Sequence, residues 1–267
     1  MRLSNFFVAG MLNTVSVGLY HLGQELGRTP TAEVYAPLTR ALYPGFALIA
    51  DKPDRLKANA LRACSILSAV VLPIGIGWAL IANDFIMLVL GEKWLPIVPI
   101  IQVLSPVAGA LSVGAIADAI AMSLSRTRLL FYRSLVFFII QSALFIFGLA
   151  QFGLMGAIYL LVLSLVIFLI MQLHILNLLL GFPSYLPLAV TWRSWISVAI
   201  MALSIIFVTD LFFAPSSTLG AVFSLFGKIA LGAFTYGLCH VVIWLLVGRP
   251  DGVEREFLRM WQRRKLQ

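Results

Sequence analysis

The stretch that decides the fold class is LLFYRSLVFFIIQSALFIFGLA at 129–150, followed by QFG at 151–153 and LMGAIYLLVLSLVIFLIMQLHIL at 154–176. Each long segment has about the 20 apolar residues that an α-helix needs to cross the hydrocarbon core of a bilayer. Arg133 is the one Asp, Glu, Lys or Arg residue in the two segments together. The stretch therefore predicts two neighbouring membrane-spanning helices joined by a short connection.

The composition of the whole chain agrees with a membrane protein. Hydrophobic residues make up 61% of the 267 residues and charged residues only 11%, against roughly 25% charged in soluble domains. A chain with so few charges cannot cover itself with a solvated surface. The formal net charge of +8 would suit nucleic acid in a soluble protein. Membrane proteins, however, collect Lys and Arg in cytoplasmic loops, so we expect no nucleic-acid partner.

Further segments of spanning length lie on both sides of this stretch. One of them, at 15–49, is more polar than the rest but long enough to cross. The apolar ones lie at 61–82, 97–124, 195–213 and 219–247. The sequence thus predicts an all-α integral membrane protein, a bundle of about seven transmembrane helices. The bundle is expected to occupy residues 1–247 and a basic tail residues 248–267.

Positive charges alternate between the connections of this bundle. Three connections are rich in Lys and Arg: the one after the polar segment, the one near Arg126 and Arg128, to which we also assign Arg133, and the C-terminal tail. The alternate connections hold one Lys or none. Because cytoplasmic loops carry the excess of Lys and Arg, we expect a multi-pass protein with its C-terminus in the cytoplasm.

The tail mixes aromatic and apolar residues with Arg, which is typical of a segment that lies on an anionic membrane surface. A solvated tail that merely follows the charge rule is an equal alternative. Lys228, inside the last span, is expected to extend to the membrane surface as long Lys side chains do; a charge facing a lumen is the alternative. The membrane-surface candidates of the tail are Arg259, Trp261, Arg263, Arg264 and Lys265.

The polar segment at 15–49 is where a functional site is expected. An ionisable side chain at membrane depth is costly unless it faces protein, a partner charge or water. On a helix, one face of this segment collects charged and small side chains, and the opposite face carries aliphatic ones. The substrate-cavity candidates on or beside the polar face are Glu25, Arg28, Thr29, Glu33 and Arg40.

Gly27, Pro30 and Pro37 predict interruptions of this helix, and broken helices are tolerated where they line a cavity. We therefore favour a water-filled, partly cationic cavity along the polar face. The alternative is internal pairing, in which Glu25 neutralises Arg28, and Glu33 neutralises Arg40, against neighbouring helices.

The sequence offers no catalytic or metal-binding constellation. His21, His174 and His240 lie on separate segments, and Cys64 and Cys239 lack the spacing of a metal site. Nucleophile elbows, zinc-protease motifs and phosphate-binding glycine-rich loops are absent from the sequence. We expect a protein that is not an enzyme and that uses no metal and no cofactor.

Four pieces of sequence carry a family resemblance: VGLYHLGQEL at 17–26, APLTRALYPGFA at 36–47, DKPDRLKAN at 51–59 and LPIGIGWALIANDFIMLVLGEKW at 72–94. In their order and spacing they resemble the O-antigen and exopolysaccharide flippases of the multidrug/oligosaccharidyl-lipid/polysaccharide exporter superfamily. Beyond residue 125 the similarity is one of hydropathy alone.

The resemblance implies a bacterial inner-membrane protein with two helical bundles around a central cavity, in which the matched pieces open the second bundle. This chain is then expected to form the C-terminal lobe, a fragment or half of a transporter that needs an N-terminal lobe or a second copy. The implied cargo is an undecaprenyl-diphosphate-linked oligosaccharide, a precursor of lipopolysaccharide or exopolysaccharide, and membrane lipid surrounds the bundle.

Two other functions stay open. One is a non-transporting membrane subunit of an envelope-polysaccharide assembly complex, and the other is a drug or ion antiporter of the same superfamily. An antiporter would depend on Glu25 and Glu33 as proton or sodium sites. A flippase for a diphosphate would depend more on Arg28 and the other arginines, because guanidinium groups bind phosphate oxygens strongly.

Overall fold

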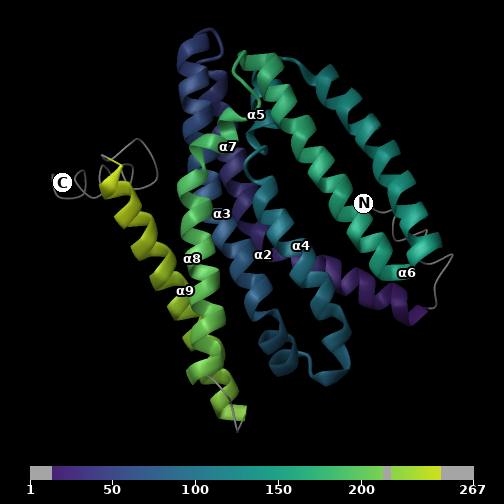
Figure 1. The fold of residues 1–267 in the computed structure, drawn as a ribbon. Helices are drawn as coiled ribbons and strands as arrows, with labels where there is room; N and C mark the ends of the chain where they lie inside the picture. The colour runs from purple at the N-terminus through teal and green to yellow at the C-terminus, as the bar shows by residue number, and fades with distance from the viewer. Residues whose placement is uncertain (1–13, 213–217, 248–267) are drawn as a thin grey trace.

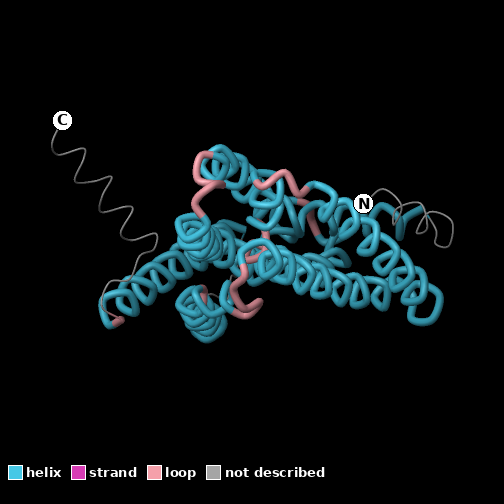
Figure 2. The backbone as a smooth tube through the Cα atoms, turned by 90° about the horizontal axis from the view of Figure 1, so that it is seen from above, coloured by secondary structure: helices cyan, strands magenta, loops and turns pink. Residues whose placement is uncertain are grey.

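The computed structural model describes residues 14–212 and 218–247. Within these ranges the chain is helical apart from short loops, and no strand is present (Figures 1 and 2). The predicted all-α class is confirmed. The helices are α2 (Thr14–Ala47), α3 (Pro53–Val89), the 3-10 helix η1 (Glu92–Ile97), α4 (Val98–Leu111), α5 (Ile116–Ser123), α6 (Thr127–Leu180), α7 (Leu186–Val190), α8 (Trp192–Phe212) and α9 (Thr218–Leu246).

Helix α6 contains both apolar segments of the stretch at 129–176. Gly153 separates the two arms because its φ of 66° and ψ of −158° are not helical, and a positive φ suits glycine, which has no Cβ. The arms fold back on each other (Figure 1). They approach so closely that a Cβ on Gly148 would lie 2.8 Å from the carbonyl oxygen of Gly156. Both predicted spans are therefore present as helices.

Length and apolar composition mark several of these helices as able to cross a membrane. One of them is the bent helix α6, each of whose two arms is long enough to cross, and α8 adds a shorter apolar part, Trp192–Val208. Helix α2 is not among them, so its crossing stays a prediction. The four long candidates are Pro53–Val89, Glu92–Ser123, Thr127–Leu180 and Leu219–Leu246.

The span predicted at 97–124 is divided into α4 and α5 by a tighter turn at residues 112–115, whose end residues Ser112 and Ala115 keep helical φ and ψ angles. Short-range bonds hold this break: the amide of Gly114 donates to Leu111 O at 3.2 Å. The thiol of Cys64 on α3 donates to Val113 O at 3.3 Å. Irregular backbone at membrane depth is tolerated where protein satisfies its polar groups, and all four residues of the break are buried.

The interruption expected in α2 is wrong, because the helix runs without a break through Pro30, Pro37 and Pro44. Proline has no N–H, so Pro30 leaves the carbonyl of Leu26 without its helical partner. The indole Nε1 of Trp78 on α3 donates to that carbonyl at 2.8 Å. A neighbouring helix thus replaces the missing bond, and the backbone can stay helical.

The same device occurs in α3. Pro73 frees the carbonyl of Ala69, and the hydroxyl of Tyr236 on α9 donates to it at 2.6 Å. Helix α3 lies at the centre of the bundle and packs against α2, α4, α8 and α9. Its contact with α4 is closest at Gly75, where a Cβ would lie 2.6 Å from Ser105 O. Small residues of this kind let membrane helices pack backbone to backbone.

Candidate functional site

The polar face of α2 lies on the outside of the described bundle. Glu25, Glu33 and Arg40 are exposed. Thr29 is half-buried, and its hydroxyl donates to the carbonyl of Glu25 at 2.8 Å. Leu26, next to Glu25 on the helix, packs into the apolar cluster formed by α3, η1 and α4. The exposed charges of α2 are thus directed away from the described bundle.

Arg28 departs from that group, because it turns toward the inside. It lines a hollow of about 220 Å³ together with Tyr35 of the same helix, Ser112 at the break between α4 and α5, and Gln172 on the second arm of α6. The sequence placed four of the five candidates on one face and Arg28 beside it, and the structure divides them between an outer surface and this inner hollow.

The predicted pairing of Glu33 with Arg40, in the C-terminal half of α2, is not seen among the described residues. Glu33 and Arg40 form no ion pair among the described residues, and both are exposed. Within the described part of the chain, their charges are not neutralised by an ion pair.

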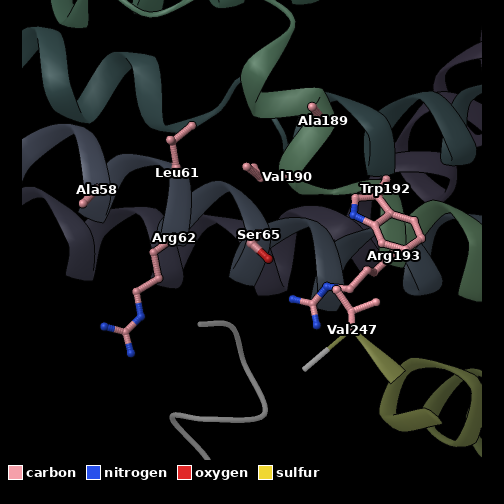
Figure 3. A pocket seen from close by; sticks show the side chains of 9 residues that line it. All are labelled: Ala58, Leu61, Arg62, Ser65, Ala189, Val190, Trp192, Arg193 and Val247. Carbon is pink, nitrogen blue, oxygen red and sulfur yellow. The ribbon is translucent and has the colours of Figure 1, made fainter. Parts of the chain in front are cut away.

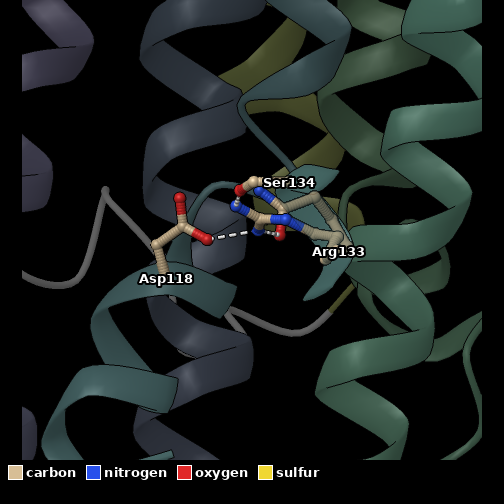
Figure 4. Close-up of polar contacts among 4 residues, drawn as sticks. Asp118, Arg133 and Ser134 are labelled. Atoms are coloured by element: carbon tan, nitrogen blue, oxygen red, sulfur yellow. Dashed lines mark hydrogen bonds and ion pairs between the residues drawn. The ribbon is translucent and has the colours of Figure 1, made fainter. Parts of the chain in front are cut away.

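A buried polar network lies beside the inner hollow (Figure 4). Arg133 on the first arm of α6 is 9% exposed. Its Nη1 donates to Asp118 Oδ1 on α5 at 2.5 Å and to Gln172 Oε1 on the second arm of α6 at 2.6 Å. Its guanidinium carbon lies 4.9 Å from the centre of the Phe168 ring, within the range of a cation–π contact. The network ties three helical segments together.

Assigning Arg133 to a cytoplasmic connection was wrong. The residue lies inside a helix and is satisfied by protein, so it belongs to the packing of the bundle and does not report orientation. A signal was available in the sequence: Asp118 is the one charged residue of the segment at 97–124, and Gln172 is an amide within the uncharged segment at 154–176. Lone polar residues in membrane spans usually find one another across helices.

Lys228 has a partner that was not predicted. It is 7% exposed, and its Nζ forms an ion pair with Asp84 near the end of α3; its extension to the membrane surface stays a prediction. Lys228 also lines an apolar cavity of about 500 Å³ with Pro73 and Tyr236. Asp84 neutralises a charge that would otherwise be costly at this depth.

The remaining sequence candidates contribute no second site within the described part of the chain. The tail residues Arg259, Trp261, Arg263, Arg264 and Lys265 lie outside the described residues. No group of three or more His, Cys, Asp or Glu side chains that could hold a metal occurs in residues 14–212 and 218–247.

Together, the long apolar helices and their buried ion pairs define a multi-pass, all-α membrane protein. Residues 1–99 match the family described as polysaccharide biosynthesis protein. The match covers the part of the chain that carried the resemblance to polysaccharide flippases, and it supports that resemblance.

Three relatives are similar to the chain over part of its length. The chain is 38% identical over 104 residues to an uncharacterized membrane protein in the cps region of Klebsiella pneumoniae, covering 39% of this chain and 21% of that protein. It is 31% identical over 130 residues to the lipopolysaccharide biosynthesis protein WzxC of Escherichia coli K12, covering 49% of this chain and 26% of that protein.

The third relative is the teichuronic acid biosynthesis protein TuaB of Bacillus subtilis 168, 27% identical over 104 residues, covering 39% of this chain and 22% of that protein. The chain therefore matches between 21% and 26% of the length of these three relatives. No solved structure matches the chain.

Proposed function

We propose that this chain forms the C-terminal lobe of a flippase that moves lipid-linked polysaccharide precursors across the bacterial inner membrane. The observation that carries the proposal is the outward face of α2, on which Glu25, Glu33 and Arg40 are exposed while Leu26 packs inward. The names of two relatives refer to lipopolysaccharide and teichuronic acid biosynthesis, which supports an envelope polysaccharide as the cargo.

Physical cost explains why such a face needs a second lobe. A charged side chain exposed to lipid at membrane depth costs several kcal/mol, whereas the same charge facing water inside a transporter is solvated. A second lobe, either an N-terminal bundle or another copy of this chain, would enclose water between itself and α2. Arg28 and Arg40 would then offset the diphosphate of an undecaprenyl-linked oligosaccharide, since guanidinium groups bind phosphate oxygens bidentately.

The expected orientation follows from the charges that remain in the connections. With Arg133 removed from the count, Lys57 and Arg128 still mark two connections as cytoplasmic, and the tail marks the C-terminus. We expect single cysteines at positions 57 and 128 of a cysteine-free variant to resist an impermeant reagent applied to intact spheroplasts. Labelling of either position from outside would reverse the orientation.

Reconstitution tests transport directly. Proteoliposomes with a fluorescent undecaprenyl-diphosphate oligosaccharide should show translocation when this chain is combined with an N-terminal bundle from a related flippase, and none with this chain alone. Translocation by the chain alone, with cross-linking showing a monomer, would contradict the two-lobe arrangement. A dimer that transports would identify the second copy as the missing lobe.

Two substitutions separate a flippase from an antiporter in the same assay. Arg28→Ala should abolish transport of the diphosphate-linked cargo, while Glu25→Ala should reduce it less. Arg55→Ala, on the exposed first turn of α3, is the matched control and should leave transport unchanged. A dominant effect of Glu25→Ala would favour an ion-coupled antiporter instead.

A further inference from the structure

A second pocket, distinct from the face of α2 and from the Arg133 network, lies where α3, α7, α8 and the end of α9 meet (Figure 3). Its volume is about 410 Å³. Two arginines are the charged members of its described lining: Arg62 comes from α3 and Arg193 from the start of α8. Ser65, on the next turn of α3, lies between them.

One of these positive charges lies at the start of a helix, where a cation is usually disfavoured. Arg193 is only 5% exposed and is the second residue of α8, a helix of 21 residues. The N-terminus of a helix carries a partial positive charge, so it attracts anions and disfavours a cation. Arg62 adds a second guanidinium group. Figure 3 shows both groups and the Ser65 hydroxyl on the same side of α3.

An arrangement of two guanidinium groups, a hydroxyl and a helix N-terminus around one pocket favours a tetrahedral oxyanion. Arginine donates two parallel hydrogen bonds to phosphate oxygens, and its charge makes them stronger than neutral ones. The partial positive charge of the helix end acts in the same direction. A phosphate group therefore suits the polar half of the pocket.

The other half of the pocket indicates what the phosphate is attached to. Leu61, Val190 and Val247 supply an apolar wall. Trp192 also lines the pocket and is 43% exposed, and tryptophan at the end of a spanning helix is typical of the interface between headgroups and acyl chains. A ligand with a phosphate and an adjoining apolar part matches both halves.

We infer that this pocket binds the phosphate group of a membrane lipid. Arg62 and Arg193 donate to the phosphate oxygens, and the apolar wall contacts the glycerol and the first carbons of the acyl chains. The inference does not rest on the proposed transport, because neither arginine is part of α2 or lines the hollow that takes in Arg28.

Native mass spectrometry of the purified full chain tests this site, with phosphatidylglycerol as the probe. Arg62→Gln and Arg193→Gln should each weaken binding about tenfold, the effect of losing one charge-assisted hydrogen-bonding partner. Arg62→Lys, which keeps the charge but not the planar fork, should weaken it less. Arg55→Gln, exposed on the same helix, is the matched control and should bind like the unaltered chain.

Two further arms separate the sources of the phosphate. Diacylglycerol, which has no phosphate, should not be retained, and inorganic phosphate at millimolar concentration should not displace phosphatidylglycerol. Retention of diacylglycerol, or an equal loss of binding in Arg55→Gln, would overturn the site. Binding of inorganic phosphate with the same dependence on both arginines would overturn the lipid as its source.

A folding control keeps the result interpretable. Thermal unfolding is followed for every variant. Arg193 is more buried than Arg62, so if Arg193→Gln lowers the melting temperature, Arg62→Gln is the decisive variant. Phosphatidylglycerol should raise the melting temperature of the unaltered chain and of Arg55→Gln, and fail to raise that of Arg62→Gln. An equal rise in all three would contradict the site.

Discussion

Helix α2 and the region where α5 meets α6 both bring charges into an apolar bundle, but in opposite directions. On α2, Glu33 and Arg40 are exposed on the outer surface of the lobe. In α6, Arg133 is buried and bonded to Asp118 and Gln172. The sequence makes the first group conspicuous, since five polar residues share one segment, and hides the second, whose members come from three segments.

The comparison shows that charged side chains in such a bundle can have two different roles, one in packing and one in function. A charge that finds its partners within the lobe stabilises the packing of that lobe, and its removal should be felt in the free energy of unfolding. A charge that the lobe leaves on its surface contributes little to that packing. It must be satisfied from outside, and its removal should be felt in function.

The largest effect should come from the buried network. Arg133→Ala leaves Asp118 and Gln172 without their partner in a low-dielectric surrounding. Removing one member of a buried ion pair destabilises strongly; since Asp118 is 35% exposed, we expect a loss of about 2–4 kcal/mol in the free energy of unfolding. Unfolding by dodecyl sulfate in mixed micelles, followed by tryptophan fluorescence, measures it.

Arg128→Ala is the matched control for that experiment, because Arg128 lies one turn earlier on the same helix and is exposed. Its effect should stay within about 0.5 kcal/mol, as for most surface substitutions. Equal losses for the two variants would mean that the network contributes nothing beyond the general charge of the helix.

Substituting one glycine in each region is the next test of this difference. A Cβ on Gly114, in the break between α4 and α5, would lie 2.8 Å from the Cβ of Gln172, and this is the rigid base of the side chain. Gly114→Ala should therefore destabilise by about 1–3 kcal/mol through overpacking. The same change at Gly18 on α2 meets no atom within 4 Å.

Gly18→Ala should be neutral or stabilise by up to about 1 kcal/mol, because alanine is the better helix former. Thermal unfolding in detergent, run in parallel for both variants, compares them directly. A destabilisation of Gly18→Ala as large as that of Gly114→Ala would show that the outer face of α2 is packed after all.

Hydropathy alone predicted most of the fold. The two arms of α6 appear where the apolar segments at 129–150 and 154–176 predicted them, because about 20 apolar residues in sequence have few alternatives to a spanning helix. The divided helix at 97–124 could not be predicted in this way. Its break at Ser112–Ala115 carries no proline, and it is held by tertiary contacts such as that of Cys64.

The prolines of α2 are the reverse case, in which the sequence predicted a break that the structure does not contain. Pro30 and Pro37 are strong signals of a break, and no local signal reveals that Trp78, on the next helix, supplies the missing bond. For the candidate site, the sequence likewise predicted only which residues of α2 share a face. Periodicity predicted the outward face of Glu25 and Glu33, whereas the hollow that takes in Arg28 depends on how α4, the turn after it and α6 pack against α2.

Trp78→Phe should have a smaller effect than either buried change. The variant keeps the aromatic packing but leaves the carbonyl of Leu26 without a donor, which we expect to lower the free energy of unfolding by about 1 kcal/mol. Adding Pro30→Ala gives residue 30 an N–H that can donate to the same carbonyl, so the double variant should recover most of the loss. Dodecyl sulfate unfolding of the four-member cycle measures the coupling. Absence of coupling would contradict the replacement of the helical bond by Trp78.

The smallest effect on stability should come from the outer face of α2. Glu33→Ala and Arg40→Ala remove exposed charges that form no ion pair with each other, so each should change the free energy of unfolding by no more than about 0.5 kcal/mol. The double variant should be additive, because distant residues without a shared partner rarely couple.

The same variants should nonetheless impair transport when this lobe is combined with a second one, because the face that they alter is the one proposed to border the cavity. Dodecyl sulfate unfolding and the reconstitution assay, applied to one set of purified variants, therefore give opposite rankings for α2 and for Arg133. A loss of more than about 1.5 kcal/mol on Glu33→Ala or Arg40→Ala would exceed what an exposed charge contributes. These residues would then be satisfied within the lobe, as Arg133 is, and the argument that α2 faces a second lobe would lose its physical basis.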